Sequence, residues 1–181
     1  MSGAAYVPPT ALDRVAGLLG SDAFLVPCIR GTKVPAVTYT QRPFEATQTP
    51  AYRYALASGE FNIAVYLGEM SGGLCALDFD KDEDLTAFLA LNPVLAGTLR
   101  TRGSRGGMVW VRVAAATAEN RSPKSEIRGQ NGDGKDGRDG SYGAADYPAS
   151  CNTAHFEWRA NGRLSTIYGR HPKGMDYAVL V

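Results

Sequence analysis

The chain has 181 residues, 44% hydrophobic and 20% charged, which is typical of one globular domain with a sizeable core. Its longest apolar runs are too short to span a bilayer and its first residues lack a secretory signal pattern, so we expect no membrane partner. Cys28, Cys75 and Cys151 lack metal-ligand spacing, and their odd number favours reduced thiols and a cytoplasmic location. With a net charge of +1, any affinity for nucleic acid must come from local patches.

Hydrophobic spacing predicts short helices and strands along the whole chain. The expected helices cover residues 10–19, 51–58 and 83–92, the first capped by Thr10 and the last by Asp82 or a neighbour. The expected strands cover residues 23–29, two runs within 62–80 joined by a Gly-rich turn, 98–101, 108–113, and a hairpin over 156–168 with Asn161-Gly162 as its turn.

The order of these elements predicts an α+β fold with a mostly antiparallel sheet, in a single domain over residues 1–181. Residues 30–50 are rich in Gly, Pro and Thr and predict a long irregular connection. Residues 129–150 are too polar and Gly-rich to pack, which predicts a flexible loop.

The apolar run "GGLCALDFDKDEDL" ends in two carboxylates two positions apart, Asp78 and Asp80. Side chains alternate along a strand, so these acids share one face while Leu77 and Phe79 share the other. One interpretation is a solvated charge run before a helix. The other is a Mg²⁺ or Mn²⁺ site, because hard divalent cations prefer carboxylate oxygens.

Two further stretches carry groups suited to anions. "TLRTRGSRGG" places Arg102, Ser104 and Arg105 among glycines before a strand, where backbone N–H groups and guanidinium forks can meet phosphate. A plain basic turn is the alternative. In "HFEWRANGRLSTIYGRHPKG", Glu157 and Arg159 share one strand face. They are either part of a functional site or simply members of a cross-strand set of salt bridges. His171 follows in a bent loop that could contact an anion or simply be exposed.

In this order the three stretches, with "GTKVPA" upstream, resemble the N-terminal primase–polymerase domain of the archaeo-eukaryotic primase superfamily, in the form found in phage and plasmid replication proteins. The resemblance covers roughly residues 10–177. It implies an RRM-like core and a template-dependent nucleotidyltransferase that makes or extends primers on single-stranded DNA. It also implies Mg²⁺ or Mn²⁺, nucleoside triphosphates, and a fused or associated helicase.

Matched residue by residue, the resemblance implies roles for particular side chains. Asp78, Asp80 and Glu157 would bind metal and catalyse transfer, with Glu126 in "SEIRG" as a fallback third acid. Arg102, Ser104, Arg105, Arg159 and His171 would bind the nucleotide. The charged residues Arg112, Arg121, Lys124 and Arg128 could form a basic track for template DNA.

The sequence departs from many relatives at one position, since "GGMVW" stands where they have a histidine after "GG". Two alternatives to the polymerase hypothesis stay open. One is a catalytically reduced nucleotide- or nucleic-acid-binding module that serves a helicase. The other is a metal-dependent nuclease, although no lysine is paired with the acids as in such enzymes. The ending "DYAVLV" is interpreted as a domain cut from a longer chain.

Overall fold

The computed structural model describes residues 8–114 and 150–181. The helices there are α1 (Ala11–Leu19), α2 (Pro50–Ala57) and α3 (Asp82–Leu91), with 3₁₀ turns η1 (Phe44–Gln48), η2 (Glu69–Ser71) and η3 (Pro93–Leu95). The strands are β1 (Leu25–Ile29), β2 (Phe61–Tyr66), β3 (Leu74–Phe79), β4 (Arg100–Arg102), β5 (Gly107–Arg112), β6 (Cys151–Asn152), β7 (Glu157–Arg159), β8 (Leu164–Tyr168) and β9 (Ala178–Val179). No helix of these ranges is long and apolar enough to cross a membrane.

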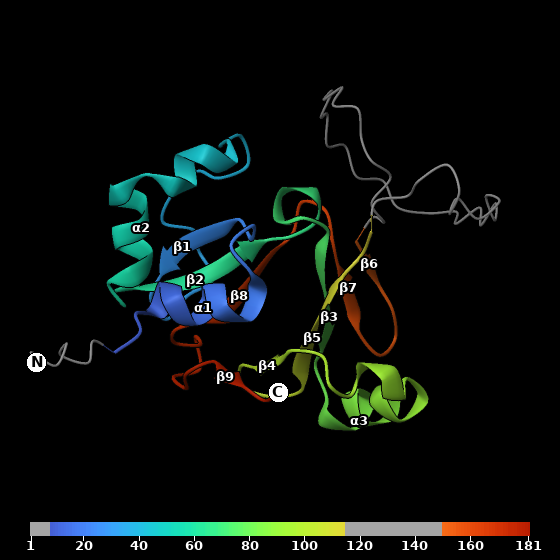
Figure 1. The fold of residues 1–181 in the computed structure, drawn as a ribbon. Helices are drawn as coiled ribbons and strands as arrows, with labels where there is room; N and C mark the ends of the chain where they lie inside the picture. Colours follow the sequence, from blue (N-terminus) through green and yellow to red (C-terminus); the bar gives the residue numbers. More distant parts are fainter. Residues whose placement is uncertain (1–7, 115–149) are drawn as a thin grey trace, which may run out of the picture.

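The strands form two sheets, one ordered β1-β2-β8 and one ordered β6-β7-β3-β5-β4-β9. Every pairing in them is antiparallel. Figure 1 shows α1 and α2 beside the three-stranded sheet and α3 beside the six-stranded sheet, at the end of β3. The predicted α+β class is therefore confirmed, as is the predominance of antiparallel strands.

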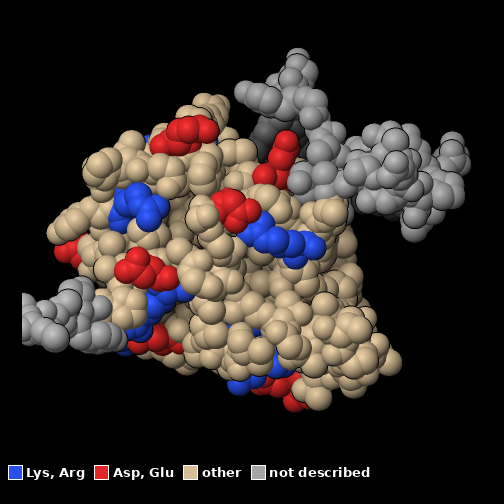
Figure 2. All heavy atoms as spheres, viewed as in Figure 1, with Lys and Arg blue, Asp and Glu red and all other residues tan. Residues whose placement is uncertain are grey.

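The face of the molecule in Figure 2 carries acidic and basic side chains in small mixed groups. On the face in Figure 2, Lys and Arg lie next to Asp and Glu over both sheets. This mixture agrees with the net charge of +1. Any strongly anionic ligand must then be bound by a local arrangement of side chains.

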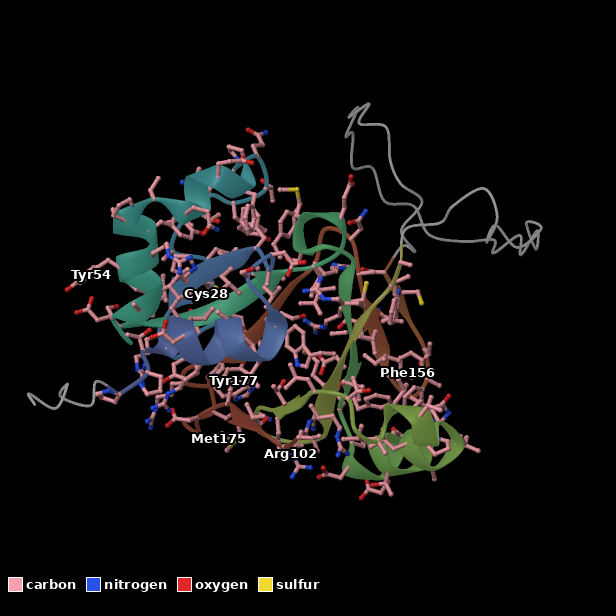
Figure 3. All side chains as sticks on the ribbon, in the orientation of Figure 1. Cys28, Tyr54, Arg102, Phe156, Met175 and Tyr177 are labelled. Atoms are coloured by element: carbon pink, nitrogen blue, oxygen red, sulfur yellow. The ribbon has the colours of Figure 1, made fainter. Side chains whose placement is uncertain are left out.

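The two faces of β3 have different roles, as the alternation in sequence predicted. Leu77 and Phe79 pack with α3 residues and with Phe156, which Figure 3 shows beside α3. Ala76 packs on the opposite side, in the core cluster that contains Trp110. Asp78 lies two residues after Ala76 and therefore on the same face of β3. Because Leu77 and Phe79 are packed beneath α3, the Asp78 carboxylate points to the opposite face.

The caps of the first and last helices differ from each other. Thr10 and Asp13 form a capping box at α1, which confirms the predicted cap. The side-chain cap expected at α3, from Asp82 or a neighbour, does not form. Lys81 is the N-cap and makes no side-chain cap bond, while Asp82 already lies inside the helix, where its carboxylate pairs with Arg102.

The predicted hairpin over residues 156–168 is also wrong. A turn does form at Asn161-Gly162, but β7 pairs with β3 while β8 pairs with β2 in the other sheet. The chain thus crosses between sheets at Asn161, whose Oδ1 accepts a hydrogen bond of 2.8 Å from the Glu69 N–H. The β2–β3 connection also passes close to Asn161. A Cβ at Gly68 would lie only 2.0 Å from Asn161 Oδ1, so this close approach requires glycine.

Candidate active site

Asp78 lies at the centre of three neighbouring strands. In the sheet register it is opposite Met108 of β5 on one side and Glu157 of β7 on the other. Directly paired residues on adjacent strands point to the same face, so Asp78 and Glu157 are cross-strand neighbours. Asp80 follows immediately after the end of β3.

One guanidinium joins the two neighbouring carboxylates. Arg159 Nη2 lies 2.9 Å from Asp78 Oδ2 and 2.7 Å from Glu157 Oε2. The Arg159 and Asp78 side chains are only 20% and 29% exposed, and the buried Nε of Arg159 has no hydrogen-bond partner. A cation held this closely by two partly buried acids marks a place where positive charge is strongly favoured.

The groups around Asp78 shift the pKa of its carboxyl in opposite directions. Burial raises the pKa of the Asp78 carboxyl, Arg159 and Lys33 lower it, and Glu157 and Asp80 raise it further. The net direction is upward, so the ionised carboxylate is poorly stabilised by the protein alone. Additional positive charge at this point would stabilise it.

Two glycines bring the β4–β5 loop close to the acids. Gly106 has φ +57°, and a Cβ there would lie 1.9 Å from the Phe79 carbonyl oxygen, so the turn can pack against the end of β3 only with glycine. This contact places Arg105 Nη2 3.2 Å from Asp80 Oδ1. A Cβ at Gly103 would come within 2.8 Å of His171 Cδ2, so this glycine makes room for the imidazole.

The His171 ring is held in one tautomer. Its Nδ1 accepts a hydrogen bond of 3.1 Å from the Lys173 N–H, which leaves Nε2 to carry the ring proton as a donor. The ring packs edge-to-face on Tyr177, with centroids 5.5 Å apart. Partial burial, with Lys33 and Lys173 nearby, lowers the pKa of His171, so the imidazole is neutral near pH 7.

Buried Asn62 on β2 holds together two loops that are far apart in sequence. Its Nδ2 donates to the Thr32 carbonyl at 2.9 Å and to the Arg170 carbonyl at 2.8 Å, and its Oδ1 accepts from the Arg170 N–H at 2.7 Å. These bonds place Lys33 and His171, each one residue further along, on the same side of the molecule.

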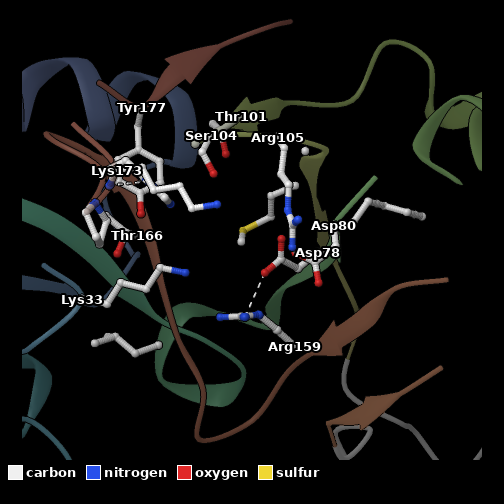
Figure 4. A pocket seen from close by; sticks show the side chains of 17 residues that line it. Lys33, Asp78, Asp80, Thr101, Ser104, Arg105, Arg159, Thr166, Lys173 and Tyr177 are labelled. Carbon is white, nitrogen blue, oxygen red and sulfur yellow. Dashed lines mark hydrogen bonds and ion pairs between the residues drawn. The ribbon is translucent and has the colours of Figure 1, made fainter. Parts of the chain in front are cut away.

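Most of these groups line one cavity of about 350 Å³, which we call the basic cavity (Figure 4). Six of the predicted site residues line it, namely Asp78, Asp80, Ser104, Arg105, Arg159 and His171. Lys33, Lys173, Thr101, Thr166 and Tyr177 also line it and were not predicted as site residues. Lys33 lies in "GTKVPA" and Lys173 in "GRHPKG", so the sequence held a signal for both.

Other predicted residues do not reach this cavity. Glu157 lines a neighbouring hollow. Arg102 points away from the cavity, donating from Nε to the Gly106 carbonyl at 2.8 Å and pairing with Asp82. Four predicted residues lie outside the described ranges, namely Arg121, Lys124, Glu126 and Arg128, as does the expected flexible loop except for residue 150.

Arg112 lies at the far end of β5, opposite Leu74 rather than Asp78. Its two terminal nitrogens bind both Asp22 carboxylate oxygens, at 3.0 and 2.8 Å. They also donate to the carbonyls of Leu19, Ser71 and Gly72 at 2.7–3.0 Å. Arg112 thus ties α1, η2 and β5 together with donors that a DNA phosphate would otherwise have to use.

We expect Arg112→Ala to lower the free energy of unfolding by about 2 kcal/mol, since a charged donor is lost and three carbonyls lose their partner. Arg112→Lys should recover little of this loss because an ammonium cannot reproduce the fork. Chemical denaturation measures the effect. An unchanged stability together with weaker binding of single-stranded DNA would instead identify Arg112 as a DNA contact.

The acids have the chemistry of a divalent-cation site. Within residues 8–114 and 150–181, no three His, Cys, Asp or Glu side chains are already gathered as a metal site. Mg²⁺ is usually bound by one or two carboxylates together with waters and substrate phosphates. Asp78 and Glu157 already hold a cationic group between them, so the donor set fits such an ion.

The structure is that of an α+β protein in which carboxylates face a cavity lined by basic and hydroxyl side chains, which are groups that can bind phosphate. Residues 18–181 match the family described as bifunctional DNA primase/polymerase, N-terminal, and the chain belongs to this family. Membership implies a nucleotidyltransferase-type enzyme of DNA replication with nucleotide and DNA substrates, in a family that generally depends on divalent metal. A search of curated proteins gave no match.

Proposed function

We propose that the protein adds nucleotides from nucleoside triphosphates to a DNA strand, directed by a single-stranded template. The observation that carries this proposal is the basic cavity, in which an acid pair faces lysine, arginine, serine and histidine side chains. Carboxylates suit the metal ions of phosphoryl transfer, and the facing donors suit a triphosphate.

The basic cavity supplies the charge that a triphosphate needs. Lys33 and Lys173 reach into it from one side, and Arg105 lies across from them (Figure 4). Ser104 adds a hydroxyl and His171 a neutral N–H donor. Together these groups can neutralise and orient the phosphates while the α-phosphorus is directed towards Asp78.

Asp78, Asp80 and Glu157 would hold Mg²⁺ or Mn²⁺. When bound, such an ion stabilises the charge that develops on the attacking and leaving oxygens. Arg159 holds carboxylate oxygens of two of these acids, Asp78 and Glu157, in the structure. Arg159 would therefore have to release them, and its guanidinium would then be free to bind a phosphate group of the substrate.

The function is tested by incubating the protein with a primed single-stranded template, labelled nucleotides and Mg²⁺ or Mn²⁺. Products longer than the primer, with the sequence that the template specifies, support the proposal. Parallel reactions with ribo- and deoxyribonucleotides, and with unprimed template, separate primer synthesis from extension. Degradation of the DNA without extension would favour the nuclease alternative.

We expect Arg105→Ala and His171→Ala each to raise the nucleotide concentration needed for half-maximal extension. Losing one charged or directed contact to phosphate costs about 1.5–3 kcal/mol, which is roughly a tenfold to hundredfold loss in affinity. Steady-state extension at varied nucleotide concentration measures the change. Affinity for template should change much less.

Arg102→Ala is the matched control, because Arg102 ends β4 close to Arg105 in sequence, but its side chain pairs with Asp82. It should leave the nucleotide dependence nearly unchanged. If Arg102→Ala raises this nucleotide concentration and Arg105→Ala does not, the nucleotide lies outside the basic cavity. The earlier assignment of Arg102 to nucleotide binding would then stand.

One observation favours the second candidate, a binding module without catalysis. Met108 lines the basic cavity just after "GG", and a thioether cannot donate a hydrogen bond to a triphosphate. Nucleotide binding without extension would support this alternative. Template contacts by Arg121, Lys124 and Arg128, and a helicase partner, remain predictions of either candidate.

A further inference from the structure

A second hollow adjoins the basic cavity, and Asp78 and Asp80 line both. It has a volume of about 500 Å³ and lies between the start of α3 and the β6–β7 segment. Four side chains line both spaces, namely Lys33, Asp78, Asp80 and Arg159. We call it the acidic hollow, and it is lined further by Lys81, Asp84, Asn152, Thr153, Ala154, His155, Phe156 and Glu157.

The two spaces differ in charge. The basic cavity has four basic side chains, Lys33, Arg105, Arg159 and Lys173, against the acids Asp78 and Asp80. The acidic hollow has three, Lys33, Lys81 and Arg159, against the acids Asp78, Asp80, Asp84 and Glu157. A triphosphate therefore prefers the basic cavity, whereas the acidic hollow suits a group that brings no phosphate to the acids.

We propose that the acidic hollow binds the acceptor, the 3′-terminal nucleotide of the strand being extended, in a role that rests on the proposed function. The end of such a strand presents an uncharged sugar hydroxyl, while the phosphate of the terminal nucleotide is on the 5′ carbon of the same sugar and can stay on the exposed side of the hollow, away from the acids. This chemistry matches a hollow whose acids would repel a phosphate but can accept a hydrogen bond from a hydroxyl.

The positions of the two spaces also fit the geometry of the transfer. The attacking and leaving oxygens stand on opposite sides of the transferred phosphorus, roughly in line. The acceptor's 3′ oxygen forms a bond to the α-phosphorus as the bond from that phosphorus to the β-bridging oxygen breaks. Pyrophosphate leaves with the electron pair, and the hydroxyl proton passes to water. Substrates in the two spaces would approach each other from opposite sides of Asp78.

His155 is the side chain best placed to hold the acceptor. Its side chain is 72% exposed, and its Nδ1 lies 3.1 Å from Asp84 Oδ1, a carboxylate on α3. This bond orients the ring and leaves its face open. Next to it, Phe156 packs against Phe79 and Phe88, which gives the hollow a rigid wall. An oriented ring beside a rigid wall can stack on a terminal base or sugar.

The experiment uses the full chain with His155→Ala and His155→Phe, each compared with Arg105→Ala. We expect His155→Ala to raise the KM for a primed template roughly tenfold, the usual effect of losing one stacking ring, and to leave the KM for nucleotide unchanged. His155→Phe keeps a ring and should restore most of the primer affinity. Arg105→Ala should show the opposite pattern.

Equilibrium binding gives a readout that does not depend on catalysis. His155→Ala should weaken binding of a fluorescent primer–template junction but not of the unprimed template. The inference is overturned if the junction binds both proteins equally, or if His155→Ala raises the nucleotide KM instead. If the parent binds the junction through His155 yet never extends it, the proposed function fails while the acceptor site stands.

Discussion

Asp78→Ala is expected to abolish nucleotide addition, with kcat at least ~1,000-fold below the parent value, which corresponds to about 4 kcal/mol of transition-state stabilisation. Asp78 lines both the basic cavity and the acidic hollow, and it is the register partner of Glu157. Within the described residues it therefore stands where both substrates would meet. Primer extension under saturating nucleotide and template measures the loss.

The fold of this variant should survive. Burial raises the pKa of Asp78, so its contribution to stability falls as the pH rises through the folded-state pKa. At neutral pH the ionised carboxylate is a cost to the fold, and removing it takes away no stabilisation from this source. Arg159 keeps its bond to Glu157. The melting temperature should accordingly change little.

Glu83→Ala is the matched control for Asp78→Ala. Glu83 is an exposed acid in the first turn of α3 and lines neither space. Its removal should leave extension at the parent rate. Retained extension in Asp78→Ala would disprove the acid-pair mechanism, whereas a large fall in melting temperature would show that Asp78 acts through the fold.

Much of the fold could be predicted because its signals are local. The Thr10 cap, the alternation of Leu77, Asp78 and Phe79, and the loop before β5 each depend on residues close in sequence. Such patterns determine whether a segment is a helix or a strand, and which side chains share a face, independently of distant contacts. The same alternation correctly separates Glu157 and Arg159 from Phe156 and Trp158, which pack under α3.

What could not be predicted depends on contacts between distant segments. The hairpin prediction failed because Asn161 binds the Glu69 N–H and sends β7 and β8 into different sheets. A two-residue turn motif carries no information about the partner of each strand. The position of Lys33 at the basic cavity likewise depends on a distant contact, because Asn62 holds its loop beside Arg170. The contacts of Arg112 with α1 and η2 could not be predicted either, because its partners lie up to 93 residues away in the sequence.

Arg159 connects the stability of the site with its proposed chemistry. Two partly buried carboxylates share its Nη2, so the guanidinium offsets a repulsion that the sheet register imposes on Asp78 and Glu157. A divalent ion bound by the same oxygens would replace that cation rather than add to it. Stability with and without metal should therefore depend on which cation is present.

Arg159→Met should lower the free energy of unfolding by about 2 kcal/mol without divalent metal, a shift of roughly 5 °C in melting temperature for a chain of this size. Methionine keeps the apolar stem but leaves the two acids facing each other. Added Mg²⁺ or Mn²⁺ should restore much of the loss and should stabilise the variant more than the parent, in which Arg159 competes for the same oxygens. Thermal unfolding with and without metal measures both effects, and Arg163→Met, which removes an exposed arginine outside both spaces, serves as the control. Equal metal-induced shifts in parent, variant and control would show that the carboxylates beside Arg159 do not bind the ion.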